Sequence, residues 1–422
     1  MKCSIAGWVA VALIVSGCSM QRPASEAVEE PVVQTGLEAF LASPPEIVKG
    51  KRIGLVTNQS GLTATGERNV DAIEKIPGVK ITAIFSPEHG ISGTRRGSIE
   101  SSVDEKTGIT ITSLYGEIRK PTPELLKDVD VLVYDIQDIG VRQYTYESTM
   151  ALTMQAAAEK GIPYIVLDRP NPITGNIVEG NLTDTAYLSF VGIYPVASRH
   201  GMTMGELAKM YNDVHKIGAD LTVIPMKGWK RGMWWDETGL AWINPSPNIR
   251  RVEAEVIYPG SVFFEGGNVS EGRGTPLPLE QVGAPWLDNQ KVASAMNAMK
   301  LAGVRFEPVD IQVDSTGRRY RNEIIKGIRF EVTDRETFRP IRAALLLFNE
   351  IRKTHPDKFE WGRSRHFDQL AGGAELRNAI DSGTVVALLD RWDAEAAQFA
   401  EARKPYLIYG NDGEISTVGG GE

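Results

Sequence analysis

Short apolar runs alternate with helix-like stretches along the first half of the chain. The runs are rich in β-branched residues and lack a polar face, which is typical of parallel strands buried on both sides of a sheet. Residues 147–161 form the clearest helical stretch, with Gly161 as its C-cap. This alternation predicts an α/β domain with a mostly parallel sheet. The runs are RIGLVTN (52–58), VKITAIFS (79–86), VDVLVYDIQ (129–137), PYIVLD (163–168) and LTVIPM (221–226).

The pattern changes near residue 245. Residues 244–286 contain many Pro and Gly and show little helical periodicity, so we expect a long ordered loop, of a kind that is often functional. Two strands at 304–311 and 327–334 and an amphipathic helix at 335–356 follow. The second half is therefore expected to form a smaller α+β domain. The predicted domains are 36–245 and 246–422.

The N-terminus has the pattern of an export signal. Residues 5–15 are apolar but too few for a comfortable membrane span. The VSGC that follows resembles a bacterial lipobox, so we expect residues 1–17 to be removed and Cys18 to be lipidated; a plain secretory signal is the alternative. Ser19, in place of Asp, favours the outer membrane over the inner one. Residues 18–35 then form a polar tether, and the protein is expected at the periplasmic face, anchored to the membrane by its lipid.

Composition and charge limit the function further. A chain of 422 residues with 42% hydrophobic and 24% charged residues is an ordinary globular protein, too long for one small core. The net charge of −8 argues against nucleic acid as a partner. Both cysteines lie within the first eighteen residues, and the five histidines lack close metal-ligand spacing. GxSxG, P-loop and HExxH motifs are missing from the sequence, so we expect neither a cofactor nor a metal.

Polar side chains follow four of the predicted strands. In open α/β sheets the ligand binds beyond the carboxyl ends of the strands. We therefore expect these side chains to gather at one edge of the sheet, around one site. They are Asn58 and Gln59, then Glu88 and His89, then Gln137, Asp138 and Arg142, and finally Asp168, Arg169 and Asn171.

The SPEHG turn at 86–90 is the strongest candidate for chemistry. Pro87 and Gly90 shape a turn that presents Glu88 and His89. A partly buried carboxyl group has a raised pKa and can act as a general acid near neutral pH. The alternative is a helix cap or a salt bridge at the end of a strand.

Three further segments offer candidate binding groups, each with a structural alternative. In 134–149, Asp135, Arg142, Tyr144 and Tyr146 either orient a ligand or form a buried hydrogen-bond network. His200 either faces the site or simply precedes a helix, whose capping box is enough to explain the local sequence. The glycine-rich loop 265–276 is either a ligand loop or an exposed turn, and it carries Glu265, Asn268, Ser270, Glu271 and Arg273.

Long motifs resemble one known family. VTNQSG, SPEHG, SLYG, VYDIQDIGVRQYTYEST, LDRPNP, RHGMTMGELA, PSPN, EGGNVSEGRGTPLPLEQVGAPW and FDQLAGGAELRNAI occur in the order typical of the NamZ-type exo-β-N-acetylmuramidases, from about residue 36 to 410. The resemblance implies a glycosidase that removes N-acetylmuramic acid (MurNAc) from the non-reducing ends of peptidoglycan fragments. It also implies a Rossmann-like domain, a smaller C-terminal domain and an active-site cleft between them, but it does not imply a bound nucleotide. The family's catalytic machinery corresponds best to Glu88.

Glycosidases usually need two carboxyl groups, about 5–5.5 Å apart for retention and 6.5–9.5 Å for inversion. We expect Glu88 to protonate the leaving oxygen and Glu271, Asp135 or Glu265, in that order, to take the second role. A route assisted by the 2-acetamido group stays open. Arg142 or Arg273 is expected to bind the lactyl carboxylate of the substrate.

Two other functions compete with this interpretation. One is a periplasmic lipoprotein that binds muropeptides without cleaving them. The other is a carboxyl-dependent amidase that acts on cell-wall peptides.

Overall fold

The computed structural model describes residues 33–95, 97 and 100–415. The described residues belong to one compact unit. The expected signal peptide, Cys18 and most of the expected tether lie outside the described residues. Among the described residues, no helix combines the length and the apolar character needed to cross a membrane.

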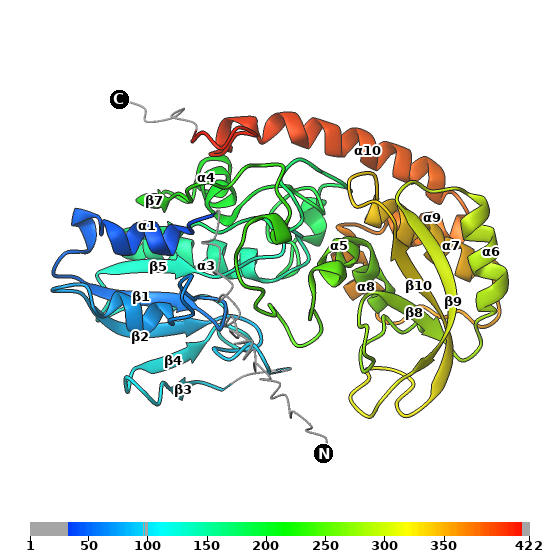
Figure 1. Ribbon diagram of the computed structural model, residues 1–422, viewed down its shortest axis with the longest axis horizontal. Coiled ribbons are helices and arrows are strands. Elements are labelled where there is room, and N and C mark those ends of the chain that lie inside the picture. The colour runs from blue at the N-terminus through cyan, green and yellow to red at the C-terminus, as the bar shows by residue number, and fades with distance from the viewer. Residues whose placement is uncertain (1–32, 96, 98–99, 416–422) are drawn as a thin grey trace, which may run out of the picture. The chain divides into compact units, whose positions relative to one another are not determined.

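Within the described residues, the first half of the chain forms a seven-stranded sheet in the order β3-β4-β2-β1-β5-β6-β7 (Figure 1). Every neighbouring pair is parallel except β3 with β4. The mostly parallel sheet is therefore confirmed, and the five predicted runs correspond to β1, β2, β5, β6 and β7. The strands are β1 (Arg52–Thr57), β2 (Lys80–Ser86), β3 (Ser102–Val103), β4 (Thr110–Ser113), β5 (Val131–Asp135), β6 (Tyr164–Leu167) and β7 (Leu221–Ile224).

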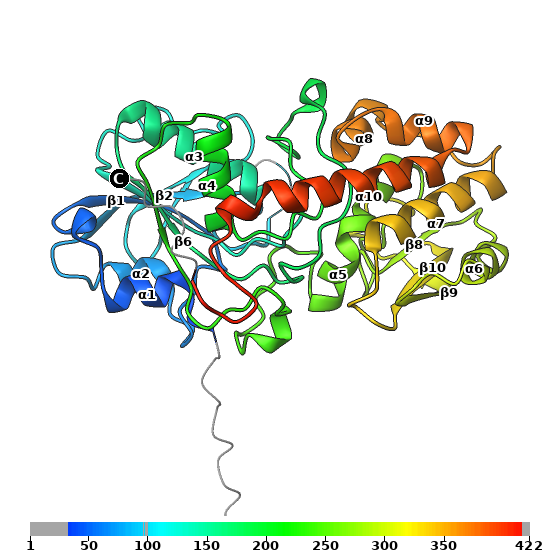
Figure 2. The ribbon, with the colours of Figure 1, turned by 90° about the horizontal axis from the view of Figure 1, so that it is seen from above.

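Helices cover both faces of this sheet. Successive side chains of a strand point to opposite faces. Thus Leu55 of β1 packs in one core cluster with Phe40, whereas Val56 packs in another with Met154 and Leu207. Figure 2 shows α1 and α2 on one side of the sheet and α3 and α4 on the other. These helices are α1 (Gly36–Ala42), α2 (Asn69–Ile73), α3 (Tyr146–Lys160) and α4 (Met204–Val214).

The second half forms a smaller antiparallel sheet in the order β8-β10-β9, again among the described residues. The predicted amphipathic helix is α7, which begins with Pro340 at its first turn and packs against α5 and α6. The remaining elements of this half are β8 (Gln281–Ala284), β9 (Val304–Gln312), β10 (Ile324–Val332), α5 (Val252–Ser261), the 3₁₀ helix η4 (Val262–Gly266), α6 (Asn289–Ala298), α7 (Pro340–Thr354), α8 (Ser364–Ala371), α9 (Glu375–Ser382) and α10 (Val385–Ala402).

The expectation of a loop throughout 244–286 is wrong. This segment contains α5, and every residue from 254 to 261 is buried. A helix that is buried all round has no polar face, so it shows no amphipathic period. Pro259 inside α5 also conceals the helix, because a proline in the sequence normally argues against a helix interior.

The end of the chain ties the two halves together. After α10, which packs on α7 and α9, the chain returns to the first half (Figure 2). There the Tyr409 hydroxyl donates to Asp168 at 2.7 Å, and Arg403 donates to the carbonyl of Gly175 at 2.9 Å. One hydrophobic core cluster contains residues of both halves. The boundary at 245/246 stays a prediction.

Candidate active site

A cavity of about 610 Å³ lies at the carboxyl end of β2 and is lined by residues of both halves of the chain. The first half contributes Glu88 and Tyr115, which follow β2 and β4. The second half contributes Tyr258 of α5, Glu265 of η4 and His366 of α8. The volume falls in the range of about 300–1,000 Å³ that is usual for small-ligand sites.

Glu88 is half-buried in a tight turn at the wall of this cavity. The turn is closed by a hydrogen bond from the Gly90 amide to the Pro87 carbonyl at 3.0 Å. His89 has a positive φ of 70° and its Nδ1 lies 2.9 Å from the Arg95 carbonyl oxygen. A positive φ at a non-glycine residue is uncommon, so the turn is specifically held.

Two hydroxyl groups orient the Glu88 carboxyl. Thr145, just before α3, donates to Oε2 at 2.8 Å. The Tyr115 hydroxyl also hydrogen-bonds to Glu88, and burial together with the Glu88 charge raises the pKa of Tyr115 to about 12. The phenol therefore keeps its proton at neutral pH and can donate to the carboxyl group.

Glu265 and Glu271 belong to a cluster with three arginines. Glu265 is bound by Arg273 at 2.5 Å and by Arg318 at 2.6 Å. Glu271 is fully buried and is bound by Arg273 at 3.0 Å and by Arg319 at 3.1 Å. Three guanidinium groups against two carboxylates leave this cluster with one excess positive charge.

The two glutamates differ in their access to the cavity. Glu265 lines it, whereas Glu271 is not among its lining residues. Burial by itself raises the pKa of Glu265, but the charge of Arg273 and hydrogen bonds with His366 and Arg318 outweigh burial and hold this pKa well below its usual range. Glu265 is therefore a permanent carboxylate at neutral pH.

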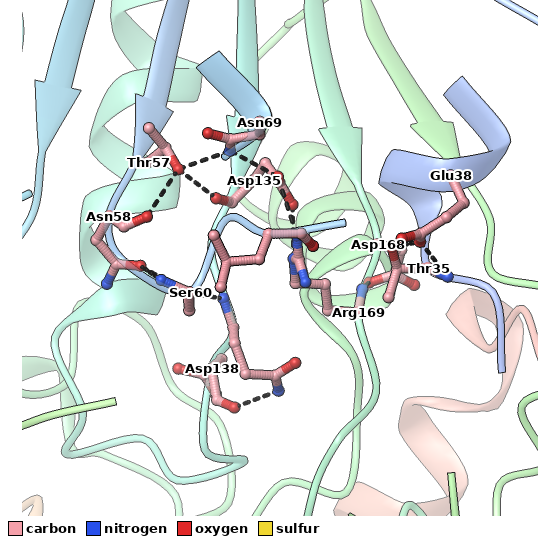
Figure 3. A network of polar contacts seen from close by, with 12 residues as sticks. Thr35, Glu38, Thr57, Asn58, Ser60, Asn69, Asp135, Asp138, Asp168 and Arg169 are labelled. Atoms are coloured by element: carbon pink, nitrogen blue, oxygen red, sulfur yellow. Dashed lines mark hydrogen bonds and ion pairs between the residues drawn. The ribbon is translucent and has the colours of Figure 1, made fainter. Parts of the chain in front are cut away.

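Five of the expected site residues line the cavity: Glu88, His89, Tyr144, Glu265 and Arg273. The others lie elsewhere, and half of them belong to a buried polar network at the carboxyl ends of β1, β5 and β6 (Figure 3). The expectation that all four strand ends surround one site is therefore wrong, because the polar groups after three of these strands bind one another.

Asp135 is the centre of this network. Its side chain is completely buried and is bound by Arg169 at 2.6 and 3.0 Å and by Asn69 at 2.7 Å. The side chain of Asn58 accepts a hydrogen bond from the Ser60 hydroxyl at 2.5 Å, and this hydroxyl accepts one from the backbone amide of Gln137 at 2.9 Å. These contacts place Asp135, Asn58 and Arg169 in a structural role and away from the cavity.

Gln137 and Asp138 continue this network. Gln137 Nε2 donates to the carbonyls of Asp138 and Pro170, both at 2.7 Å. Asp138 accepts from the Gly140 amide at 2.7 Å, and burial raises its pKa to about 7. The side-chain amide of Gln137 is therefore used within the protein, and Asp138 is buried away from solvent.

Arg142 and His200 are also buried away from the cavity. Arg142 donates to the carbonyls of Asn181 at 2.6 Å and Val196 at 2.8 Å, and burial lowers its pKa to about 10. His200 accepts from the Met202 amide at 3.1 Å, and burial, with nearby arginines, lowers its pKa to about 3. Arg142 is thus a connector of loops, and His200 is a neutral core residue.

Tyr146 and Asn268 likewise make internal contacts. Tyr146 donates its hydroxyl to the Pro245 carbonyl at 2.8 Å. Asn268 bridges to the segment at 358–360 through its amide, at 2.9 and 3.0 Å. Both side chains therefore join segments that are distant in the sequence.

The sequence reasoning missed several cavity residues. Tyr115, Ser246 and Asn248 fall inside the quoted motifs SLYG and PSPN, so they could have been found from motif membership. Arg119 and Arg363 lie in ordinary charged, exposed stretches, which give no comparable signal. Only the folded chain brings these two to the cavity.

A cavity that both halves of the chain form and that two carboxyl groups line fits the pair of carboxyl groups that glycoside hydrolases use. The models of the N-terminal and C-terminal domains of the exo-β-N-acetylmuramidase NamZ match residues 53–253 and 256–409. The chain belongs to this family and is a glycoside hydrolase.

Similar proteins agree with this assignment. The peptidoglycan β-N-acetylmuramidase NamZ of Bacillus subtilis is 43% identical over 388 residues, which cover 91% of this chain and 93% of that protein. Crystal structures of two DUF1343 family proteins from Bacteroides fragilis match with TM-scores of 0.83 and 0.72, at 35% and 31% identity. They cover 89% and 90% of this chain, and the match includes 99% of each of those chains. The expected family and enzyme class are confirmed, and the non-catalytic alternative is not supported.

Proposed function

We propose that this chain releases MurNAc from the non-reducing ends of peptidoglycan fragments and that Glu88 is its general acid. The observation that carries the proposal is the difference between the partners of the two carboxyl groups at the cavity wall. Of the two carboxyl groups that line it, Glu265 is held by guanidinium groups and Glu88 is held only by hydroxyl groups, within the described residues. A carboxyl group without a cationic partner is free to carry and deliver a proton.

The chemistry follows from this difference. Glu88 donates its proton to the glycosidic oxygen while the bond to the anomeric carbon breaks, which releases the rest of the glycan as an alcohol and leaves an oxocarbenium-like centre. Water then forms the new bond to the anomeric carbon and gives up a proton, so that free MurNAc is released and the Glu88 carboxylate is protonated again for the next cycle. Thr145 and Tyr115 keep the carboxyl group aimed at that oxygen. Glu265, an anion at the same cavity, takes the second role and stabilises the positive charge that develops on the sugar. Glu271 and Asp135, which were preferred from the sequence, do not line the cavity.

The test is Glu88→Gln with two substrates that differ only in the leaving group. General acid catalysis typically contributes about 10²- to 10⁴-fold, so kcat on a MurNAc-GlcNAc disaccharide is expected to fall by that factor. The loss on 4-nitrophenyl β-MurNAc is expected to be much smaller, because nitrophenolate leaves without protonation.

Glu265→Gln is the matched comparison. A group that stabilises the charged sugar acts on both substrates, so the two losses are expected to be similar. Equal losses on the two substrates for Glu88→Gln, with circular dichroism unchanged, would reject Glu88 as the acid. Release of amino groups and no free sugar would indicate the amidase instead.

We further propose that the mature protein is anchored through lipid on Cys18 at the periplasmic face, in the outer membrane. The support is the lipobox-like VSGC after a short apolar stretch. Cys18→Ser is expected to move the protein from the membrane fraction to the soluble periplasmic fraction and to abolish labelling with radioactive palmitate. An unchanged distribution would contradict the anchor.

A further inference from the structure

The cavity holds guanidinium groups in two different states. Arg273 and Arg318 line it but are bound to Glu265, which is part of their cluster. Arg119 and Arg363 also line it, and among the described residues neither forms an ion pair with a carboxylate. Arginine is always charged and its planar fork matches a carboxylate, so an unpaired arginine at a cavity wall is a binding group for an anion.

Arg119 is held in place without losing its charge. Its guanidinium carbon lies 4.7 Å from the centre of the Phe190 ring. Phe190 in turn lies 6.1 Å from the ring of Tyr115, and both aromatic side chains line the cavity. A cation–π contact orients a guanidinium group but leaves its N–H donors available for an anion.

Arg119 also lies on the same side of the cavity as Glu88. Its charge acts on the Tyr115 hydroxyl, and the same hydroxyl is hydrogen-bonded to Glu88. Arg119, Phe190, Tyr115 and Glu88 therefore line the same part of the cavity wall, and an anion bound by Arg119 lies at this part. Arg363, by contrast, is at the start of α8, on the wall that carries His366, and within the described part of the chain no hydrogen bond or ion pair links it to Glu88.

We infer that Arg119 binds the lactyl carboxylate of MurNAc and determines the preference for this sugar over N-acetylglucosamine (GlcNAc). The inference rests on the proposed function, because it concerns the sugar that Glu88 helps to release. The two sugars differ only in the lactyl ether on O3, so their discrimination requires a group that recognises this ether or its charge. The two arginines expected from the sequence are not available to bind this carboxylate, because Arg142 is buried and Arg273 is bound to two glutamates.

The experiment compares three 4-nitrophenyl β-glycosides: that of MurNAc, that of MurNAc with its lactyl carboxylate converted to the neutral amide, and that of GlcNAc. Arg119→Gln is expected to lower kcat/KM on MurNAc by about 10- to 100-fold, the factor for a lost charge-assisted hydrogen bond. On the neutral amide and on GlcNAc the same variant is expected to match the wild type. Arg119→Lys, which keeps the charge but not the fork, is expected to recover part of the loss.

Two control variants locate the effect. Arg363→Gln removes the other unpaired charge from the cavity wall, and Arg391→Gln removes an exposed arginine that pairs with Glu375 on α9. If Arg363→Gln, rather than Arg119→Gln, abolishes the discrimination, the inference is overturned. It is also overturned if Arg119→Gln lowers activity equally on all three glycosides, because that result indicates a structural role.

The failure of the proposed function gives a different result. A wild-type enzyme that cleaves none of the three glycosides would contradict the muramidase activity itself. A wild-type enzyme that cleaves MurNAc and its neutral amide equally well would leave the activity intact and overturn only the role of Arg119. Thermal unfolding of each variant shows whether a loss comes from misfolding.

Discussion

Two polar clusters lie at the carboxyl edge of the large sheet, and they differ in what their side chains contact. The cluster after β1, β5 and β6 is centred on Asp135 and is closed, because its charged groups bind one another inside the protein (Figure 3). The cluster after β2 contains Glu88 and is open to a cavity. Among the described residues, the loops and helices of the second half complete a cavity beside Glu88, whereas Asp135 and Arg169 do not line it. Position at a strand end therefore indicates a site only where another part of the chain leaves space above it.

The largest expected effect on stability tests the closed cluster. Asp135→Asn leaves Arg169 buried without its partner, which typically costs about 3–5 kcal/mol in the free energy of unfolding. Activity per folded molecule is expected to stay near wild type, because Asp135 does not line the cavity. Urea unfolding and the kcat of the folded fraction measure the two effects.

The matched control for Asp135→Asn is Asp310→Asn. Asp310 forms an exposed pair with Lys326 at 2.8 Å, and such pairs contribute only about 0–1 kcal/mol. If both variants lose equally little stability, the buried pair is not what holds the strand ends together.

A second test uses the pH dependence of stability. Burial raises the pKa of Asp138 to about 7 in the folded protein, against about 3.9 in the unfolded chain. The folded state therefore binds this proton more tightly. The resulting stabilisation is complete below about pH 4 and is lost as the pH rises through about 7, at about 1.4 kcal/mol per unit.

Asp138→Asn is expected to remove this dependence. Relative to wild type, the variant should gain a few kcal/mol in the free energy of unfolding between about pH 4 and pH 8. If the free energies of unfolding of the two proteins change in parallel with pH over this range, Asp138 has an ordinary pKa and water reaches the cluster.

The smallest expected effect tests the open cluster. Thr145→Val removes the hydroxyl group that donates to Glu88 Oε2 at 2.8 Å. We expect kcat to fall about 5- to 10-fold, corresponding to one hydrogen bond of about 1 kcal/mol, with little change in stability. Thr145→Ser keeps the hydroxyl group and should retain most of the activity. Equal losses in the two variants would mean that packing of the methyl group matters more than the hydrogen bond.

Much of the fold was predictable because its signals are local. The five central strands are short apolar runs, and α3, α4 and α7 have caps or periodic patterns that need no tertiary information. The edge strands β3 and β4 were missed, since Ser102–Val103 and Thr110–Ser113 are short and partly polar. The helix α5 was missed because burial on every side removes its period.

The sequence by itself determined the class of sheet, the family and the carboxyl group at SPEHG, because each of these depends on residues that are adjacent in the chain. It also placed many polar groups at the strand ends, but it could not say which of them meet each other and which meet a ligand. That choice was made by tertiary structure. Arg169 reaches Asp135 across 34 positions of sequence, whereas α5, η4 and α8 converge above Glu88 from far along the chain. A buried charge must find a partner and a cavity must remain unfilled, and both conditions depend on distances in space that the order of residues does not specify.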